Sequence, residues 1–321
     1  MDEERLELLG QIAVWYYEDG LDQTIIADRI GKSRSMVSRM LNEVRSEGIV
    51  EFRVNYPLRR DTRLEQELER LYGLDQAWVL GSRLEGDTES RMRILGKLGA
   101  RCLESRLFDG ICIGVGLGEA VHEVIRAMPT LELREASIVQ LIGSLSDRHP
   151  SIDSSELTRL LANKLSADYR YLPSPAVVNT REAAESLRKE HSIRAALEFA
   201  QNVDVALIGI GSAENELSSL YHGGFISSEE LKEVRDVGAV GDILYRFIDR
   251  NGQLVRHPQD RHVISVPLET LHLVPSVIAV AGNPGKADAV RAAIRGGHLN
   301  VLVTDGNTAN VLIAMQRGNT G

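Results

Sequence analysis

The sequence predicts an α/β protein of two domains, an N-terminal winged helix-turn-helix followed by a larger, Rossmann-like domain with a parallel sheet. Three observations support this fold class. Residues 22–45 have the pattern of two short helices around a glycine turn. From residue 77 onward, apolar runs alternate with helical stretches. The chain has 321 residues, which is enough for two hydrophobic cores.

The helix-turn-helix prediction depends on the residues around the turn. Ala27 is small where two helices must approach closely, and Gly31 follows four residues later, where the chain must turn tightly. Val37 and Leu41 are apolar at a spacing of four, so we expect them to face the first helix. Ser33 can cap the second helix through its hydroxyl.

Polar side chains of the second helix are then expected to point outward. Arginine reads guanine in the major groove and serine reaches bases or phosphates, so this pattern favours a DNA-recognition helix. Residues 29–60 hold eight Lys and Arg against three acids, although the whole chain has a net charge of −9. A purely structural helix pair is the alternative. The predicted DNA contacts are Gln23, Ser33, Arg34, Ser35, Ser38, Arg39 and Arg53.

A wing and a linker helix are predicted next. Residues 49–54 alternate apolar and charged side chains like a half-exposed strand. A helix over 60–72 has a narrow stripe of leucines, which either packs on the next domain or forms a short dimer contact. Packing is favoured because a coiled coil needs more heptads. The stripe consists of Leu64, Leu68 and Leu71. We place the DNA-binding domain at 1–57, the linker helix at 58–75 and the larger domain at 76–321.

Apolar runs in the larger domain predict a parallel sheet covered on both faces. The runs are apolar throughout and helical patterns separate them, which is typical of such sheets. The expected strands are 77–80, 111–115, 138–142, 203–210, 263–268, 277–281 and 300–304. The expected helices are 89–107, 117–127, 154–167, 182–200, 228–235, 285–295 and 307–316.

Several predicted strands run into glycine or polar residues. Ligands of open α/β sheets bind outside the carboxyl ends of the strands, so these loops predict a concave polar site. Asp242, between glycines, could accept hydrogen bonds from sugar hydroxyls, and Lys286 is a natural charge for a phosphate or carboxylate. Asp305 is either a helix cap or a ligand contact. The loops are 114–120, 141–146, 208–212, 238–242, 281–286 and 304–308.

Other classes of site are disfavoured. Gly114, Gly116 and Gly118 resemble a dinucleotide loop only weakly, because the third glycine of the Rossmann spacing is missing, and tight strand–helix packing alone is the alternative. No His, Cys and Asp cluster has ligand spacing, so we expect neither metal nor cofactor. The eight histidines are scattered without a base–acid constellation, so no catalytic residue is predicted.

Composition points to a globular protein, with 43% hydrophobic and 26% charged residues. The N-terminus shows no signal sequence and no apolar run approaches the length of a membrane span, so we expect no membrane partner. The two cysteines, Cys102 and Cys112, suggest no disulfide framework, and a cytoplasmic location follows as an expectation.

Several longer stretches together resemble one known family. They are Tyr16-Tyr17-Glu-Asp-Gly-Leu-Asp-Gln23, Ser35-Met-Val-Ser-Arg-Met-Leu41, Leu207-Ile-Gly-Ile-Gly-Ser212, Gly238-Ala-Val-Gly-Asp-Ile243 with Phe247-Ile-Asp249 and Gly252, Ala279-Val-Ala-Gly282 with Lys286, and Asn300-Val-Leu-Val-Thr-Asp305 with Thr308-Ala309. They are similar to the SorC family of sugar-responsive bacterial transcription regulators, and the resemblance covers essentially the whole chain. It implies an effector domain similar in fold to ribose-5-phosphate isomerase and glucosamine-6-phosphate deaminase. It also implies a dimer or tetramer on operator DNA.

The resemblance also implies which residues contact the effector. Asp242 and Leu244 match the segment that contacts effector in relatives, and Lys286 matches a phosphate or effector contact. The full set predicted to bind effector is Gly116, Gly118, Glu119, Gly143, Ser144, Gly211, Asp242, Leu244, Lys286 and Asp305.

Three departures from the family pattern concern the identity of the effector. Many relatives have Trp-Gly-Arg/Lys-Thr where this chain has Leu117-Gly-Glu-Ala120, so a carboxylate replaces phosphate donors. This loop resembles the branch that responds to phosphorylated autoinducer-2. Gly143-Ser144 replaces Gly-Gly, and Gly306 replaces Glu.

The sequence therefore predicts a regulator of a carbohydrate-uptake or catabolism operon that binds operator DNA as an oligomer and a sugar, expected to be phosphorylated, in its second domain. The alternatives are a sensor of a free sugar or polyol, and an enzyme of the sugar-phosphate isomerase or deaminase type.

Overall fold

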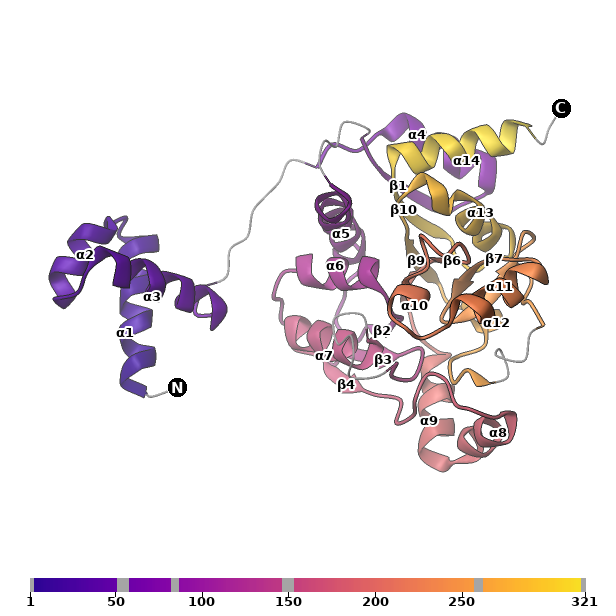
Figure 1. The fold of residues 1–321 in the computed structure, drawn as a ribbon, viewed down its shortest axis with the longest axis horizontal. Coiled ribbons are helices and arrows are strands. Elements are labelled where there is room, and N and C mark those ends of the chain that lie inside the picture. Colours follow the sequence, from indigo (N-terminus) through magenta and orange to yellow (C-terminus); the bar gives the residue numbers. More distant parts are fainter. Residues whose placement is uncertain (1–2, 51–57, 82–86, 146–152, 257–261, 319–321) are drawn as a thin grey trace. The chain divides into compact units, whose positions relative to one another are not determined.

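The computed structural model describes residues 3–50, 58–81, 87–145, 153–256 and 262–318. The chain divides into two units, Met1–Pro57 and Leu58–Gly321. In the first unit, shown in indigo in Figure 1, a π-helical stretch η1 follows the first helix. The helical elements of this unit are α1 (Glu3–Ala13), η1 (Val14–Glu18), α2 (Gln23–Ile30) and α3 (Arg34–Ser46).

The predicted helix-turn-helix is present as α2 and α3, and local hydrogen bonds fix its ends. Asp22 Oδ1 accepts hydrogen bonds from the N–H groups of Thr24 and Ile25 at the start of α2. Gly31 ends that helix with φ of 64°, a left-handed conformation that glycine adopts without steric cost. Ser33 caps α3 as predicted, because its Oγ accepts from Met36 N at 3.3 Å.

Apolar residues from all three helices form the core of the first unit. Ala27 is buried at the close approach of α2 and α3. Arg5 of α1 also forms an ion pair with Glu43 of α3 at 2.6 Å. Of the predicted wing, Ile49 lies in a bend, and residues 51–57 lie outside the described ranges. The buried core residues are Leu9, Ile12, Ala13, Ile26, Ala27, Val37, Met40, Leu41 and Val44.

The second unit is organised around a seven-stranded parallel sheet with the strand order β1-β10-β9-β5-β2-β3-β4. The sequence predicted all of these strands except β4, which has only three residues and no apolar run. The strands are β1 (Gln76–Leu80), β2 (Cys112–Val115), β3 (Ser137–Gln140), β4 (Asp168–Arg170), β5 (Val205–Gly209), β9 (Ser276–Val280) and β10 (Val301–Asp305).

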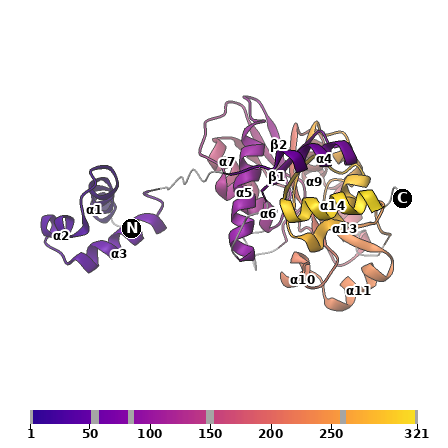
Figure 2. The same ribbon diagram turned by 90° about the horizontal axis from the view of Figure 1, so that it is seen from above.

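Helices cover both faces of this sheet, as Figures 1 and 2 show. One face carries α5 (Thr88–Glu104), α6 (Glu119–Ala127) and α7 (Ser154–Leu165), and the other carries α4 (Thr62–Tyr72), α13 (Ala287–Arg295) and α14 (Gly306–Gly318). Alternate residues of β5 enter the two cores: Val205 and Leu207 belong to one, and Ala206 and Ile208 to the other. The predicted sheet, buried on both faces, is thereby confirmed.

A second, antiparallel sheet contains β6 (Gly211–Ser212), β7 (Ala239–Ile243) and β8 (Arg246–Asp249). The prediction that residues 238–242 form a strand-end loop was wrong, because Asp242 lies within β7 opposite Gly211. The glycines in this stretch permit close packing. A Cβ on Gly241 would lie 2.5 Å from the Cβ of Ala289 on α13.

Two other predicted elements differ in the structure. Residues 263–268 form isolated bridges, one of them between Ile142 and Ser265, because no continuous partner strand lies beside them in the described ranges. The helix predicted over 182–200 is broken at Glu190, whose ψ of 134° is extended. The remaining helices are α8 (Arg181–Lys189), α9 (His191–Ala200), α10 (Ser219–His222), α11 (Ser228–Asp236), α12 (Leu268–Leu271) and the 3₁₀ turn η4 (Pro284–Lys286).

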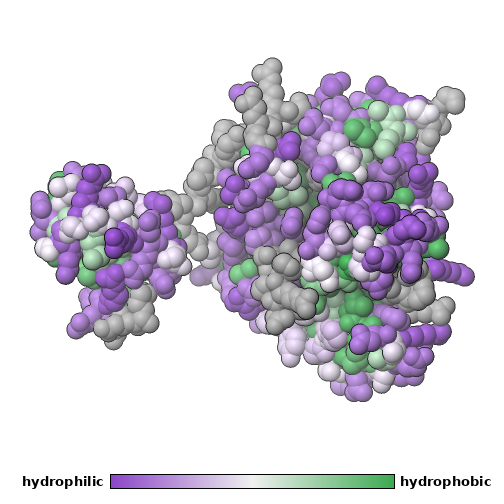
Figure 3. All heavy atoms as spheres, in the orientation of Figure 1, coloured by the Kyte–Doolittle hydropathy of each residue, from purple (hydrophilic) through white to green (hydrophobic). Residues whose placement is uncertain are grey.

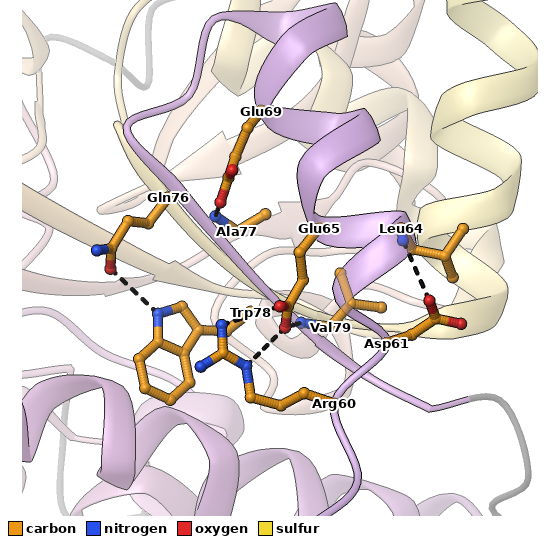
Figure 4. A network of polar contacts seen from close by, with 9 residues as sticks. All are labelled: Arg60, Asp61, Leu64, Glu65, Glu69, Gln76, Ala77, Trp78 and Val79. Atoms are coloured by element: carbon orange, nitrogen blue, oxygen red, sulfur yellow. Dashed lines mark hydrogen bonds and ion pairs between the residues drawn. The ribbon is translucent and has the colours of Figure 1, made fainter.

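Helix α4, predicted as a linker, packs on the second unit through its leucine stripe. Leu64 and Leu68 are buried in the core of one sheet face, and Leu71 is partly buried beside them. Other side chains of α4 reach the outer edge of β1 (Figure 4). Glu65 accepts a hydrogen bond from Val79 N at 2.8 Å, and Glu69 accepts one from Ala77 N at 2.9 Å.

These carboxylates occupy the place that another strand would take at this edge of the sheet. Arg60 holds Glu65 with two hydrogen bonds of 2.7 and 2.9 Å, and its guanidinium carbon lies 3.8 Å from the centre of the Trp78 ring. Asp61 N donates to Val79 O at 2.9 Å, which continues the pairing. Because edge N–H groups are templates for unwanted pairing, α4 protects this edge.

We expect Glu65→Ala to lower the free energy of unfolding by about 2–3 kcal/mol, because it leaves the buried Val79 N–H without an acceptor and separates Arg60 from its carboxylate. Urea unfolding of the full chain would measure this. The matched control is Glu89→Ala, which removes an exposed ion pair with Arg93 and should cost less than about 0.5 kcal/mol. Equal losses in both variants would show that α4 is not needed to protect the edge.

Candidate functional site

The outward face of α3 carries the side chains predicted to contact DNA. Arg34, Ser35, Ser38 and Arg39 are all exposed, as a recognition helix requires. The hydroxyl of the capping residue Ser33 lies 2.9 Å from that of Ser35, so the beginning of this face is held by local hydrogen bonds. Hydrophilic side chains cover much of the visible face of the first unit in Figure 3.

The two arginines of this face are available for a nucleic acid. Within the described residues, neither Arg34 nor Arg39 lies within ion-pair distance of a carboxylate: Glu43, one turn after Arg39, is held by Arg5, and Arg34 interacts with Asp22 only at longer range. Gln23 is the first residue of α2 and is partly buried, and Arg53 lies outside the described residues. The guanidinium groups therefore meet solvent, where phosphates or guanine edges could reach them.

A second candidate site lies at the carboxyl ends of β2 and β5. These strands are neighbours and parallel, but the strands that follow them lie toward opposite edges of the sheet. β3 and β4 lie beyond β2, and β9 and β10 lie beyond β5. Such a switch point is where open α/β sheets bind ligands. Gly116 follows β2 closely: a Cβ there would lie 3.1 Å from Leu244 Cδ2 and 3.3 Å from Leu207 O. Any larger residue at position 116 would therefore push the Leu244 side chain or the Leu207 carbonyl away by a few tenths of an ångström.

Asp242 lies directly over Gly211 at this switch point. A Cβ on Gly211 would lie 1.8 Å from Asp242 Oδ1, so only glycine leaves room for the carboxylate. Asp242 is 5% exposed. Burial raises its pKa to about 6, although the Lys286 ammonium and the N–H of Tyr245 act to lower it. A buried carboxylate that still titrates near neutral pH is typical of a functional site.

The ammonium of Lys286 interacts electrostatically with two carboxylates, the buried Asp242 and the exposed Glu119. Burial lowers the pKa of its ammonium, whereas Asp242 and Glu119 raise it. Its Nζ also donates to Ile210 O at 3.5 Å, directly after β5. The sequence predicted these three charged groups from separate loops, and the structure brings them into one electrostatic cluster. The cluster offers an ammonium donor and carboxylate acceptors, which suits a hydroxyl-rich ligand.

The turn between β7 and β8 is strained. Leu244 and Tyr245 have φ of 51° and 65°, a conformation that hairpin turns usually assign to glycine or asparagine. Left-handed non-glycine residues cost roughly 1–2 kcal/mol each. The Tyr245 hydroxyl, which donates to Phe225 O, secures the turn. The strain positions Leu244 against Gly116, and strain of this kind gathers at ligand sites.

Asp305, the last residue of β10, acts as a helix cap. It accepts hydrogen bonds from Thr308 N and Oγ1, each at 2.9 Å, and from Asn283 N at 2.9 Å. It also lines a pocket beside β1, β9 and β10, whose lining includes none of Asp242, Lys286 and Glu119. The pocket is lined by Gly81, Thr88, Arg91, Met92, Leu95, Gly282, Asn283, Pro284, Asp305, Gly306 and Asn307.

The other predicted contacts lie around the switch point. Gly118 is the N-cap of α6 with φ of 111°, and no side chain caps this helix. Gly143 follows β3, and a Cβ there would lie 2.5 Å from Ser174 O. Ser144 exchanges backbone hydrogen bonds with residues 174 and 176, at 2.9 and 2.7 Å. The backbone of both residues is thus used in packing, and none of the described contacts joins them to Asp242.

The predicted ligand loops 281–286 and 304–308 contain Asn283 and Asn307, but the set of predicted contacts named neither of them nor Arg91, and all three line the pocket beside β10. Asn283 has φ of 87° and its side chain accepts from Gly285 N, so it forms a strained turn after β9. In the sequence, the only indication of this role was that Asn283 follows the apolar run 277–281. Arg91 lies within a helix and carries no such signal.

Comparisons with known proteins agree with both units. A family model of sugar-binding domains, Sugar-bind, matches residues 56–314. The chain is 30% identical to the Deoxyribonucleoside regulator of Bacillus subtilis (strain 168), over 98% of this chain and 99% of the relative. It is 31% identical to the Transcriptional regulator LsrR of Klebsiella pneumoniae subsp. pneumoniae, over 96% of this chain and 93% of the relative.

A solved structure gives the same result over both units. The full-length sorbitol operon regulator SorC from Klebsiella pneumoniae superimposes with a TM-score of 0.73 and 28% identity, over 97% of this chain and 100% of that chain. The chain belongs to the SorC family of transcriptional regulators. This confirms the family resemblance in the sequence, and with it the regulator class.

In the part of the chain that the structure describes, no three His, Cys, Asp or Glu side chains gather in a way that could hold a metal ion. None of the described helices is both long and apolar enough to cross a membrane.

The buried carboxylate of this SorC-family protein should make its stability depend on pH. The folded-state pKa of Asp242, about 6, is above the ordinary value of 3.8, so its contribution to stability is full below pH 3.8 and is lost as the pH rises through about 6. Relative to Asp242→Asn, the wild-type chain should lose about 2 kcal/mol between pH 4 and pH 7. Urea unfolding across this range measures it, and parallel curves for the two proteins would contradict it.

Proposed function

We propose that this regulator binds operator DNA through the outward face of α3 and that a sugar or sugar phosphate at the switch point of the sheet controls this binding. The observation that carries the proposal is the cluster of Lys286, Asp242 and Glu119 beside Gly116 and Gly211, because it unites donors, acceptors and space for backbone approach. The names of the relatives support the role, since they are regulators of deoxyribonucleoside and sorbitol systems.

A phosphorylated effector is our first choice. The N-terminus of α6 has no side-chain cap, so its amides are open to an anion, and Lys286 lies close to Glu119 in the first turn of this helix. Asp242 would then accept hydrogen bonds from hydroxyls of the sugar. A free sugar or polyol is the second choice, because two carboxylates act electrostatically on the single ammonium of Lys286.

Control of DNA binding would follow from linkage. An effector that binds one arrangement of the oligomer more tightly must change the DNA affinity of that arrangement by the same coupling free energy. Two copies would present two α3 helices to the half-sites of a palindromic operator, as symmetric regulators do. We place this activity in the cytoplasm, where operator DNA is found in bacteria.

An enzyme of the isomerase or deaminase type is disfavoured by this proposal. Asp242 and Glu119 interact electrostatically with Lys286, and Asp305, in the separate pocket beside β10, accepts hydrogen bonds from the N–H groups of residues 283 and 308. Incubation of the purified protein with phosphorylated and free sugars should therefore leave them unchanged. Turnover in this assay would replace the regulator proposal with catalysis.

We expect Arg34→Ala and Arg39→Ala each to weaken operator binding by about 1–3 kcal/mol, since each loses a phosphate or base contact. Fluorescence anisotropy with labelled operator DNA at fixed salt concentration measures this loss. Arg194→Ala, which changes an exposed arginine of the second unit, is the matched control and should bind as the wild type does. Unchanged affinity in both α3 variants would remove α3 from the DNA interface.

Effector identity is best tested by thermal shift with paired phosphorylated and free pentoses, hexoses, polyols and autoinducer-2. A ligand at a hundred times its dissociation constant should stabilise the protein by about 2.7 kcal/mol. We expect Lys286→Ala to lose this shift while it keeps operator affinity, and the exposed Lys189→Ala to keep both. A normal shift in Lys286→Ala would exclude Lys286 from the site. Shifts with free sugars alone would favour the second choice of effector.

A further inference from the structure

The seven-stranded sheet has one protected edge and one open edge. At the protected edge, carboxylates of α4 accept the outward N–H groups of β1. At the other edge lies β4, and all three of its residues, Asp168, Tyr169 and Arg170, are exposed. Among the described strands, none pairs with the outer side of β4. An open sheet edge is a template for another strand.

The direction of the backbone groups on β4 follows from its pairing with β3. Asp168 N donates to Ala136 O at 2.9 Å, and the parallel register continues through Tyr169 opposite Ile138. Inward and outward hydrogen-bonding groups alternate along a strand. The N–H and C=O of Tyr169 therefore point to the open edge, where they form the centre of a docking position for one further strand.

The side chains of this edge favour a strand of the same sequence. In an antiparallel pair of two β4 strands centred on Tyr169, Asp168 of each copy lies opposite Arg170 of the other. The pairing thus sets two opposite-charge pairs across one twofold axis, which is the charge complementarity that cross-strand positions favour. A parallel arrangement in register would instead bring like charges together.

The surroundings of β4 permit this approach. Tyr169 and Tyr171 are 41% and 56% exposed, and their rings lie 6.0 Å apart on one side of the strand. The nearby charges on α7 already neutralise each other, because Arg159 pairs with Glu156 at 2.6 Å. On the other side of the strand, Arg170 is held over the Phe199 ring, 4.3 Å from its centre. Two copies would meet with aromatic rings on one side and ion pairs on the other.

We propose that β4 is a self-association surface, at which two copies of the chain join their sheets through antiparallel β4 strands centred on Tyr169. Two backbone hydrogen bonds between the Tyr169 residues, two Asp168–Arg170 ion pairs and the contact of exposed tyrosine rings stabilise this interface. The proposal does not depend on the identity of the effector or on DNA binding.

Charge reversal tests the register directly. Asp168→Arg gives a chain with two arginines at these positions, and Arg170→Asp gives a chain with two aspartates. Each variant alone sets like charges opposite each other twice, so the dissociation constant of this interface should rise at least about tenfold. When the two variants are mixed, every pair is again opposite in charge, so association should return. Sedimentation of the full-length chains at matched concentration measures all three samples.

A matched pair of controls distinguishes a specific effect on the β4 pairing from a general effect of surface charge. Asp168→Arg with Arg170→Asp in one chain restores both pairs and should associate as the wild type does. Arg63→Asp changes an exposed arginine on α4, at the opposite edge of the sheet, and should have no effect. The proposal is overturned if the single variants keep the wild-type mass, if mixing does not restore association, or if the wild-type chain sediments as a monomer.

Crosslinking gives a second readout that needs no change of charge. The two Tyr169 Cα atoms would lie about 5.5 Å apart, within the range of a disulfide, so oxidised Tyr169→Cys should give a covalent dimer. Tyr171→Cys is the control and should remain uncrosslinked, because its copies lie far apart in this register. Burial raises the pKa of native Cys102 and Cys112 to about 11, so their background reaction should be slow. Equal crosslinking at both positions would contradict the register.

Discussion

Burial of a parallel sheet on both faces is the constraint on which the second unit depends. Once α5, α6 and α7 cover one face and α4, α13 and α14 the other, the ends of the strands and the two side edges are the parts of the sheet left for other contacts. The ligand cluster, the helix that covers β1 and the open strand β4 occupy these remaining places. The proposed ligand site and the proposed association surface therefore lie at different places on the sheet.

At the carboxyl ends, the ligand cluster is held by forces that oppose each other. Asp242 and Lys286 are both penalised by burial, and each relieves part of the penalty of the other. The strained turn at Leu244 and Tyr245 adds a further local cost. A site with such costs is less stable than a purely apolar one, and a bound ligand that supplies hydrogen-bonding partners can recover part of the difference.

Residue patterns predicted most of the fold because periodicity reports burial. The buried residues of α3 and the two-sided core of β5 followed directly from apolar spacing. The patterns failed where backbone pairing is set by distant contacts. Gly241 looked like part of a loop because the sequence does not show Ala289, which packs against it. β4 was missed because an exposed edge strand of three residues has no burial pattern.

For this charged cluster, the sequence predicted one polar site at the strand ends but not which side chains would meet there, and it took the strand that holds Asp242 for a loop. Glu119, Asp242 and Lys286 belong to distant segments, and their proximity depends on the order of the strands. Arg91 was missed because its helix starts at the same edge of the sheet without any glycine signal. Strand order is set by three-dimensional packing and therefore does not appear in the spacing of residues along the chain.

The intermediate acidity of Asp242 has a thermodynamic consequence for ligand binding. With a pKa of about 6, roughly one molecule in ten carries a proton on this carboxyl at pH 7. A ligand that needs the ionised carboxylate therefore releases about 0.1 proton per molecule bound into the buffer. A ligand that needs the neutral acid instead takes up about 0.9 proton from the buffer. The observed heat of binding would then include the ionisation enthalpy of the buffer, so it is not a property of the protein and ligand alone.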